Sequence, residues 1–476
     1  MIEINDYPTL RGVVRFFEEI SVIPRGSGNR EPIADYLVSF AKERGLEYYR
    51  DEASNVIIKK AATPGYENKP TVILQGHTDM VLAKNEKCAH DLEGEGVKLY
   101  RDGDLLRAVG TTLGGDDGVA VAYALAILDS DKYSHPQLEA VFTSDEEIGL
   151  LGAVALDATK LSGNTLINID SDLEGIFTVG CAGGVRCDVD FHGEVTKKSE
   201  FAYSITLEGL HGGHSGAEIN SGYLNANKLT FELLSLLSQK ADFRIANVFG
   251  GNADNAIPRF CNVEIGADTD FVEKIDACAK ALTEKYLKAE PEMTVTVTKA
   301  APSVAMSVSD TKRLIGLISA LPNGVMKMSE DIEGLVETSL NLGVIRKDGD
   351  NIRITFSTRS SKGKEKSALC QRLKDIAENY GAKYSEHGSY PAWEYRKDSP
   401  LRDSMVKLYR EKYGKEPKVV AIHAGLECGI FAEKIENLDC VSIGPDNFDI
   451  HTTEERLSLS STARVFEFLT DLLKTI

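Results

Sequence analysis

Four short turns rich in Asp, Glu or His, three of them directly after apolar runs, constrain the fold of this chain more than any other feature. The first is QGHTD at 75–79, which follows the apolar run at 71–74. An all-apolar run is typical of a strand buried on both faces, as in a parallel sheet covered by helices. Open α/β sheets place their chemistry just beyond the ends of such strands. The sequence therefore predicts an α/β fold with a site that includes His77.

The other three turns contain acidic residues in comparable settings. LGGDDG at 113–118 leads into the apolar stretch 119–128, which is typical of a helix. The predicted strand at 137–143 is followed by SDEEIG, and the predicted strand at 165–169 stops at DSD. A single acidic turn after a strand is usually a solvated loop or a helix cap. Four such turns in one chain favour a shared site.

The residue types in these turns are those that divalent metal ions bind. Zinc takes imidazole nitrogen and carboxylate oxygen, and a catalytic site keeps one position for water. Two metals about 3.5–4 Å apart can share a bridging carboxylate and activate a water molecule between them. A further carboxylate must then take the proton of that water and pass it to the leaving nitrogen. The adjacent Glu146 and Glu147 could divide these tasks, because neighbouring side chains diverge.

A second histidine lies near the end of the chain in a similar position. A short apolar strand is predicted at 440–443 and breaks at Gly-Pro, and His451 follows in the segment 447–455. The predicted terminal helix, 461–476, comes next. His451 could supply the nitrogen ligand of a second metal, although a lone histidine in such a place is as often structural.

The order of the motifs resembles that of one enzyme superfamily. From about residue 10 to residue 476 the chain contains, in order, HTD, GGDDG, DEEIG, NIDSD, GGHSG, NAIPR, HAGLECG and IHTTEE. This order is similar to that of the dizinc aminoacylase and carboxypeptidase superfamily. Within it, the chain most resembles the cytosolic aminoacyl-histidine dipeptidases, also called Xaa-His dipeptidases or carnosinase-like peptidase D. IHAGLECG and GCAGG, at 180–184, are specific to this branch.

The resemblance implies two zinc ions per subunit, for which Mn²⁺ or Co²⁺ could substitute. The implied metal ligands are His77, Asp116, Glu147, Asp170 and His451. His77, Asp116 and Asp170 would bind one ion. Asp116, Glu147 and His451 would bind the other, so that Asp116 bridges the two.

The resemblance also implies how protons are transferred. Glu146 would act first as general base and then as general acid, and Asp79 would orient His77 through its second ring nitrogen. Asp117 departs from the pattern of close relatives, which often carry Asn after the bridging Asp. An additional negative charge at Asp117 would tighten metal binding or change the preference among divalent ions.

The middle of the chain has the pattern of a second domain. Segments 186–192 and 201–207 alternate apolar and polar residues, as half-buried strands do. Two further strands, 335–346 and 351–359, flank the hairpin signal KDGD. Helical periodicity appears at 222–238, 271–287, 311–321 and 364–380. We therefore predict an α+β lid domain built of two similar halves at 184–392, inserted into a discontinuous catalytic domain with a mostly parallel sheet at 1–183 and 393–476.

Motifs of the predicted lid would contact the substrate. By resemblance, His214 in HGGHSG would donate a hydrogen bond to the tetrahedral oxyanion, a role that can contribute about 3–4 kcal/mol. His211 in the same turn has no matching role. Asn255 and Arg359 resemble the family's clamp for the substrate carboxylate, since an arginine can bind a carboxylate through two parallel hydrogen bonds. Without the resemblance, an exposed turn histidine and a solvated arginine are the ordinary alternatives.

The HAGLECG motif, expected back in the first domain, would shape the pocket for the ends of a dipeptide. Its candidate residues are His423, Gly425 and Glu427. Glu427 would pair with the free amine of the substrate.

Composition excludes several classes of protein. A chain of 476 residues is long enough for two or three domains. Its net charge of −19 argues against binding to nucleic acid or anionic membranes. We find no signal segment at the start of the sequence. No apolar run is close to the length of about 18 residues that a membrane helix requires. Eight scattered cysteines without a CxxC pair are typical of buried thiols in a reducing compartment. We therefore expect a cytoplasmic monomer or homodimer.

The implied function is hydrolysis of unblocked dipeptides, in particular Xaa-His dipeptides including carnosine-type substrates. One alternative is an N-acyl amino acid deacylase that uses the same metals on an acylated amine. Another is a non-catalytic binding protein on a degenerate scaffold. The long lid and the GLECG sequence favour the dipeptidase over the deacylase. The complete set of inferred ligands, together with Glu146, argues against the binding protein.

Overall fold

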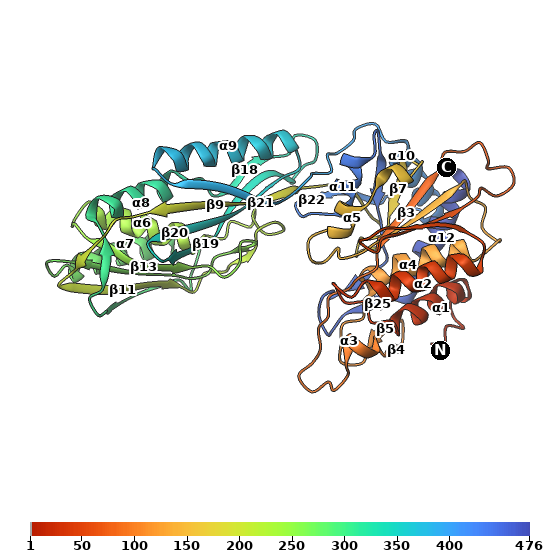
Figure 1. The fold of residues 1–476 in the computed structure, drawn as a ribbon, viewed down its shortest axis with the longest axis horizontal. Coiled ribbons are helices and arrows are strands. Elements are labelled where there is room, and N and C mark those ends of the chain that lie inside the picture. The colour runs from red at the N-terminus through yellow and green to blue at the C-terminus, as the bar shows by residue number, and fades with distance from the viewer. Residues whose placement is uncertain (1) are drawn as a thin grey trace. The chain divides into compact units, whose positions relative to one another are not determined.

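The computed structural model describes residues 2–476, which form two compact units. Unit 1 comprises residues 2–181, Tyr395–Ala421 and Leu426–Ile476, and unit 2 comprises Ala182–Glu394 and Ile422–Gly425. In Figure 1, unit 2 carries the green to light-blue colours of the middle of the chain, and unit 1 carries the colours of both ends. Unit 1 is thus discontinuous in sequence.

Unit 1 contains an eight-stranded sheet in the order β1-β2-β6-β3-β7-β23-β8-β22. The central strands β6, β3, β7 and β23 pair in parallel. Antiparallel pairs join β1, β2 and β8 to this centre. The strands are β1 (Glu47–Arg50), β2 (Val56–Lys60), β3 (Val72–His77), β6 (Leu138–Thr143), β7 (Thr165–Asn168), β8 (Ile176–Cys181), β22 (Lys418–Ile422) and β23 (Asp439–Ser442). The parallel centre confirms the predicted α/β sheet. The strands at the two edges, β1 and β22, are partly exposed and therefore need not be apolar throughout.

Helices cover the central strands, which explains why these strands carry apolar residues on both faces. The helix α4 (Gly115–Leu128) is buried nearly all round and packs against α1 (Arg11–Ser21) and β3. The other helices of unit 1 are α2 (Glu31–Glu43), α3 (Leu92–Glu95), α5 (Leu151–Ala155), α10 (Pro400–Tyr413), α11 (Glu427–Lys434) and α12 (Leu459–Thr475). A four-stranded sheet in the order β24-β25-β5-β4 completes the unit, with β4 (Leu99–Asp102), β5 (Leu105–Ala108), β24 (Asn447–Phe448) and β25 (Arg456–Ser458).

Unit 2 is a nine-stranded antiparallel sheet with helices. The strand order is β16-β11-β15-β13-β19-β20-β9-β21, and β18 pairs with β19. The strands are β9 (Gly183–His192), β11 (Phe201–Glu208), β13 (Arg244–Gly250), β15 (Cys261–Ala267), β16 (Thr294–Lys299), β18 (Gly324–Met328), β19 (Val336–Asp348), β20 (Asn351–Ser360) and β21 (Lys383–Tyr390). The helices are α6 (Ala226–Ser238), α7 (Val272–Tyr286), α8 (Val308–Ala320) and α9 (Gly363–Asn379).

The two predicted halves of this domain are present as two β-α-β-β-α-β units. One is β11-α6-β13-β15-α7-β16 and the other is β9-α8-β19-β20-α9-β21. In both, the fourth strand pairs with the first, the first with the third and the third with the second, as in ferredoxin-like folds. The strands β13 and β19 pair and join the halves into one sheet. In sequence, the whole first half lies between β9, the first strand of the second half, and α8, the first helix of the second half.

Several boundaries differ from those expected from sequence, for local reasons. The helix expected at 222–238 begins at Ala226, because Gly222 has a φ of +81° and the side chain of Asn225 caps the helix by accepting from the amide of Lys228. Segment 422–425 belongs to unit 2 by its contacts, and not to the first domain as expected. No helix within residues 2–476 combines the length and apolarity needed to cross a bilayer.

Candidate metal centre

The five metal-ligand candidates come together in unit 1, beyond the carboxyl ends of the parallel strands. His77 is the last residue of β3, Glu147 follows β6, and Asp170 follows β7. Asp116 lies in the first turn of α4, and His451 lies between β24 and β25. Because parallel strands end at the same edge of the sheet, residues from distant parts of the sequence meet there.

The ligand candidates form two triads that share Asp116. His77 Nε2 lies 3.0 Å from Asp116 Oδ1 and 3.7 Å from Asp170 Oδ1. His451 Nε2 lies 3.1 Å from Asp116 Oδ2 and 2.9 Å from Glu147 Oε1. Ligand atoms about 2.0–2.2 Å from one tetrahedral zinc lie a little over 3 Å apart. The donor set therefore fits two divalent cations, and each oxygen of Asp116 belongs to a different triad.

The electrostatics of the cluster also fit a cation. Burial raises the pKa of Asp170 well above its ordinary value, and the nearby charges of Asp117 and Asp116 raise it further, against an opposing effect of His77. Such carboxylates repel one another unless a positive charge lies between them. A bound divalent ion would be the largest local charge and would stabilise the ionised carboxylates.

Asp79 holds both His77 and the loop that carries the two glutamates. His77 Nδ1 lies 3.4 Å from Asp79 Oδ1 and 3.1 Å from the carbonyl of the same residue. Burial lowers the pKa of His77, but hydrogen bonds with Asp116 and Asp79 more than offset this and raise the pKa well above its ordinary value. The carboxylate of Asp79 also accepts hydrogen bonds from the amides of Glu146 and Glu147, at 2.9 and 3.3 Å. Asp79 therefore leaves His77 Nε2 for the metal side and fixes the loop beside it.

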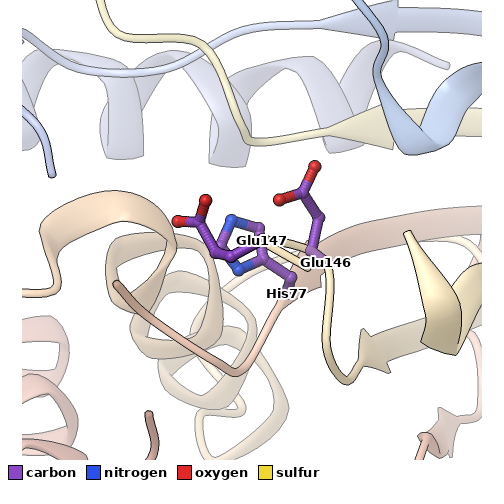
Figure 2. A group of neighbouring side chains, drawn as sticks. All are labelled: His77, Glu146 and Glu147. Carbon is purple, nitrogen blue, oxygen red and sulfur yellow. The ribbon is translucent and has the colours of Figure 1, made fainter. Parts of the chain in front are cut away.

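Glu146 and Glu147 lie on either side of His77 and point apart. Ligand atoms of the three side chains all lie within 4.8 Å of one another, and Figure 2 shows the two carboxylates diverging around the imidazole. Burial, followed by the charges of Glu427, Glu147 and Asp116, raises the pKa of Glu146 to about 8, although His77 opposes the shift. A carboxyl group that binds a proton near neutral pH suits a group that accepts and then returns one.

Two buried residues that sequence reasoning missed organise the loop before α4. The carboxylate of Glu455 accepts hydrogen bonds from the amides of Leu113, Gly114 and Gly115 at 2.7, 2.9 and 2.8 Å, and from that of Asp116 at 3.3 Å. A run of amides pointing to one place needs an anion, and the adjacent glycines were the available signal.

Arg25 is the second of these residues and joins two of the ligand loops. Its buried guanidinium donates to the carbonyl oxygens of Thr78, Asp79 and Gly114. Those carbonyls lie next to His77 and Asp116 in sequence. Arg25 therefore ties the loop after β3 to the loop before α4, and no local sequence signal marked it.

Replacement of Glu455 by alanine is expected to lower the free energy of unfolding by about 1–3 kcal/mol, because buried amides lose their acceptor. We also expect weaker metal binding, since the loop that carries Asp116 is released. Urea unfolding of the metal-free protein and competition with a zinc chelator would measure the two effects. Glu454→Ala is a matched control, because the neighbouring side chain is 73% exposed. Equal metal affinity in Glu455→Ala and Glu454→Ala would contradict this role.

Asp117, for which the sequence led us to expect an additional negative charge near the metals, contacts the backbone of His77. Its side chain is buried and its Oδ2 accepts a hydrogen bond from the amide of His77 at 3.1 Å. Burial raises the pKa of Asp117 well above its ordinary value, and the charge of Asp116 adds to this against the effect of His77. The contact with His77 gives Asp117 a structural role beside the metal-ligand candidates.

In unit 2, the structure brings His214 next to Asn255. His214 pairs with Ala256 across the short strands β12 (Gly213–His214) and β14 (Ala256–Ile257). The amide of Ser215 donates to the carbonyl of Asn255 at 2.8 Å. His214 and Asn255 line a cavity of about 390 Å³ together with Asn252, Pro258 and Phe260.

The hydrogen bonds of His214 define which ring nitrogen carries the proton. His214 Nδ1 accepts from the amides of Gly216 and Ala217, at 3.3 and 3.1 Å. Burial and the charge of Arg359 lower the pKa of His214, which favours the neutral ring. A neutral ring whose Nδ1 accepts has its proton on Nε2. His214 Nε2 is therefore a hydrogen-bond donor.

Arg359 and His423 also lie in unit 2, and both are nearly buried. Arg359, in β20, is 8% exposed. His423 Nε2 lies 2.7 Å from Ser339 Oγ, and burial together with the charge of Arg359 lowers the pKa of His423 to about 4. Gly425 belongs to the same short segment of unit 2. His423 is thus joined to Ser339, the residue paired with Arg359 across β19 and β20.

Glu427 lies in unit 1, at the first turn of α11, and is fully buried. Its Oε2 accepts from Gln75 Nε2 and from Thr143 Oγ1, each at 2.6 Å. Burial raises the pKa of Glu427 to about 7. These contacts tie α11 to β3 and β6. They favour a structural role for Glu427 over the expected pairing with a substrate amine.

Comparison with known proteins places the whole chain among peptidases. Residues 73–475 match the profile of Peptidase family M20/M25/M40. The chain is 36% identical over 467 residues to the cytosol non-specific dipeptidase of Escherichia coli K12, covering 97% of this chain and 96% of that protein. The crystal structure of aminoacylhistidine dipeptidase from Vibrio alginolyticus is similar, with a TM-score of 0.90, 37% identity and coverage of 98% and 96% of the two chains. Aminopeptidase PepT from Bacillus cereus shares the fold, with a TM-score of 0.58, 16% identity and 98% of each chain covered.

Proposed function

Because this chain belongs to the M20/M25/M40 family of peptidases, we propose that it is a metal-dependent dipeptidase acting on dipeptides with free termini, with a preference for Xaa-His. The observation that carries the proposal is the pair of ligand triads sharing Asp116, with Glu146 beside them. Two similar proteins support the substrate class by their names, since one is a non-specific dipeptidase and the other an aminoacylhistidine dipeptidase.

The metal ligands in this proposal are those of the two triads: His77, Asp116, Glu147, Asp170 and His451. Zinc suits this mixture of imidazole and carboxylate ligands, and Mn²⁺ or Co²⁺ could substitute. When bound, two such ions would polarise the scissile carbonyl and lower the pKa of a water molecule toward about 7.

Glu146 would transfer the protons of the reaction. It would accept a proton from the attacking water and donate it to the leaving amine, and a pKa near the working pH suits a group that must do both. Asp79 keeps Glu146 in place through the amide hydrogen bond described above. His214, whose Nε2 carries the proton, would donate a hydrogen bond to the oxyanion of the tetrahedral intermediate.

The free C-terminus of the substrate would be bound by Arg359, with Asn255 as a second polar contact. A nearly buried guanidinium binds a carboxylate strongly, because little water competes and the two planar groups match. His423 and Gly425 would complete the surroundings of that carboxylate. Binding of the carboxylate at a fixed place sets the distance between the C-terminus and the scissile bond, so short peptides are selected.

The preference for histidine is tested by a substrate panel. We expect zinc-dependent release of free histidine from β-Ala-His, Gly-His and Ala-His, measured with ninhydrin after chromatographic separation. Gly-Leu, a tripeptide and an acetylated amino acid are the comparison substrates. Cleavage of all the dipeptides would show a broad dipeptidase. Cleavage of only the acetylated amino acid would show a deacylase and would contradict the proposal.

We also propose that the enzyme works in the cytoplasm. None of the eight cysteines, all within the described residues, forms a disulfide bond, as in proteins of reducing compartments. The name of the Escherichia coli relative supports the same location for that protein.

A further inference from the structure

A row of four residues crosses unit 2 on adjacent strands and includes the proposed carboxylate-binding arginine. Arg359 of β20 is paired with Ser339 of β19 on one side and with Gly184 of β9 on the other. Gly184 is paired in turn with Tyr390 of β21. Residues paired directly across antiparallel strands project from the same face of the sheet. Tyr390 and Arg359 are therefore on one face, separated only by the strand that carries Gly184.

Gly184 allows the two side chains to meet across that strand. A Cβ atom at Gly184 would lie 2.4 Å from both Cζ and the hydroxyl oxygen of Tyr390. A Cβ atom at Gly425 would lie 2.8 Å from Cε2 of the same ring. The phenol ring thus fills the space that side chains at these two positions would occupy. This explains why Gly184 of the GCAGG motif and Gly425 of the HAGLECG motif are glycines. Neither has a side chain that could take part in the chemistry.

The position of the ring brings its hydroxyl group to Arg359. Arg359 Nη1 donates a hydrogen bond to the Tyr390 hydroxyl oxygen at 3.1 Å. The backbone of Tyr390 is also held, because Lys366 Nζ donates to its carbonyl oxygen at 2.5 Å and to that of Gly184 at 3.3 Å. The Tyr390 hydroxyl group therefore has a defined position, and its hydrogen bond orients the guanidinium of Arg359.

The hydrogen bond selects one edge of the guanidinium for a ligand. Tyr390 takes one N–H of Nη1, and we assign the edge formed by Nε and Nη2 to a planar anion. Arg359 Nε is buried and has no hydrogen-bond partner among the residues that the structure describes. A buried donor without an acceptor lowers the stability of the fold. A carboxylate bound side-on at that edge would accept the hydrogen bond of Arg359 Nε.

We propose that Tyr390 is a positioning residue that fixes the Arg359 guanidinium for two-point binding of the substrate's terminal carboxylate. The inference rests on the proposed function and names one determinant of its specificity for a free C-terminus. Tyr390 acts through Arg359 and needs no contact with the reacting atoms. Its loss should therefore affect binding of the carboxylate and leave the chemical step intact.

Tyr390→Phe is the test, because it removes the hydroxyl group and keeps the ring between Gly184 and Gly425. We expect KM for Gly-His to rise about tenfold, the loss typical of a weakened hydrogen bond to a charged group, with kcat changed less than about twofold. For the amide of the same dipeptide, KM should not change. The ratio of kcat/KM for the free dipeptide to that for the amide should therefore fall about tenfold.

Tyr384→Phe is the matched control, since it makes the same change in the same strand. The Tyr384 hydroxyl group donates to Cys187 and Glu386, and it forms no hydrogen bond with Arg359 among the residues that the structure describes. We expect its KM for both substrates to equal that of the wild type. Thermal unfolding of both variants would establish that they fold.

Each other result overturns the inference in a recognisable way. An unchanged KM for Gly-His in Tyr390→Phe would show that Tyr390 does not position Arg359, while the proposed function stands. An equal rise in KM for the dipeptide and its amide would show a general structural effect. Absence of dipeptide hydrolysis by the wild type would overturn the proposed function, and this inference with it.

Discussion

Replacement of Asp116 by alanine is expected to remove both metal ions and all measurable hydrolysis. Each carboxylate oxygen of Asp116 faces a different histidine, at 3.0 Å from His77 Nε2 and 3.1 Å from His451 Nε2. One substitution therefore takes a ligand from both triads at once. The metal content per chain should fall from about two to near zero after dialysis, because a bridging carboxylate is what two-metal sites share.

Metal analysis by inductively coupled plasma mass spectrometry, beside a dipeptide assay, measures both effects. Asp131→Ala is a suitable control, since this aspartate of unit 1 is fully exposed and the same atoms are removed. We expect the control to keep two metals and full activity. An Asp116→Ala protein that retained both metals would refute the bridging assignment. Retention of one metal would show that the two triads bind independently of Asp116.

Replacement of Glu146 by glutamine or alanine is expected to leave both metals bound and to reduce kcat by about a hundredfold to ten-thousandfold. This is the usual contribution of a positioned general acid–base group. Glu146 belongs to neither of the two triads around Asp116, yet its carboxylate lies within reach of His77 and Glu147. Glutamine has nearly the shape of glutamate and cannot accept and return the proton.

The measurement compares kcat and metal content in the same preparation. Glu52→Gln, at an exposed position of unit 1, controls for the change from acid to amide. We expect that variant to match the wild type in both quantities. Normal turnover by Glu146→Ala would remove Glu146 from the mechanism. Loss of a metal from Glu146→Gln would instead assign Glu146 as a ligand.

Three of the metal-ligand candidates could be predicted from sequence because each lies in a short motif at or just after the end of an apolar strand. His77 ends an all-apolar strand, and Glu147 and Asp170 follow two others within a few residues. Such runs indicate burial on both faces, and burial on both faces places the strands in the middle of a sheet. The parallel order of β6, β3, β7 and β23 then brings the turns to one edge.

The halves of unit 2 were predicted as two similar runs, but their interleaving was not. The strand β9 pairs with β20, and the register joins Gly184 to Arg359, which lies far along the chain. Alternation of apolar and polar residues shows that a strand buries one face. It carries no information on which distant strand lies beside it, so the pairing had to come from the tertiary structure.

By itself, the sequence determined the residue types of the ligand candidates, their order and, for three of them, their positions at strand ends, because those features depend on local patterns of burial and turn formation. Only the tertiary structure decided that Glu455 caps the amides of residues 113–116, from about 340 residues away. Only it placed the ring of Tyr390 over Gly184, against Arg359. These roles depend on which surfaces meet when the strands pair and the helices pack. A periodicity in the sequence reports that a face is covered, and the packed structure alone identifies what covers it.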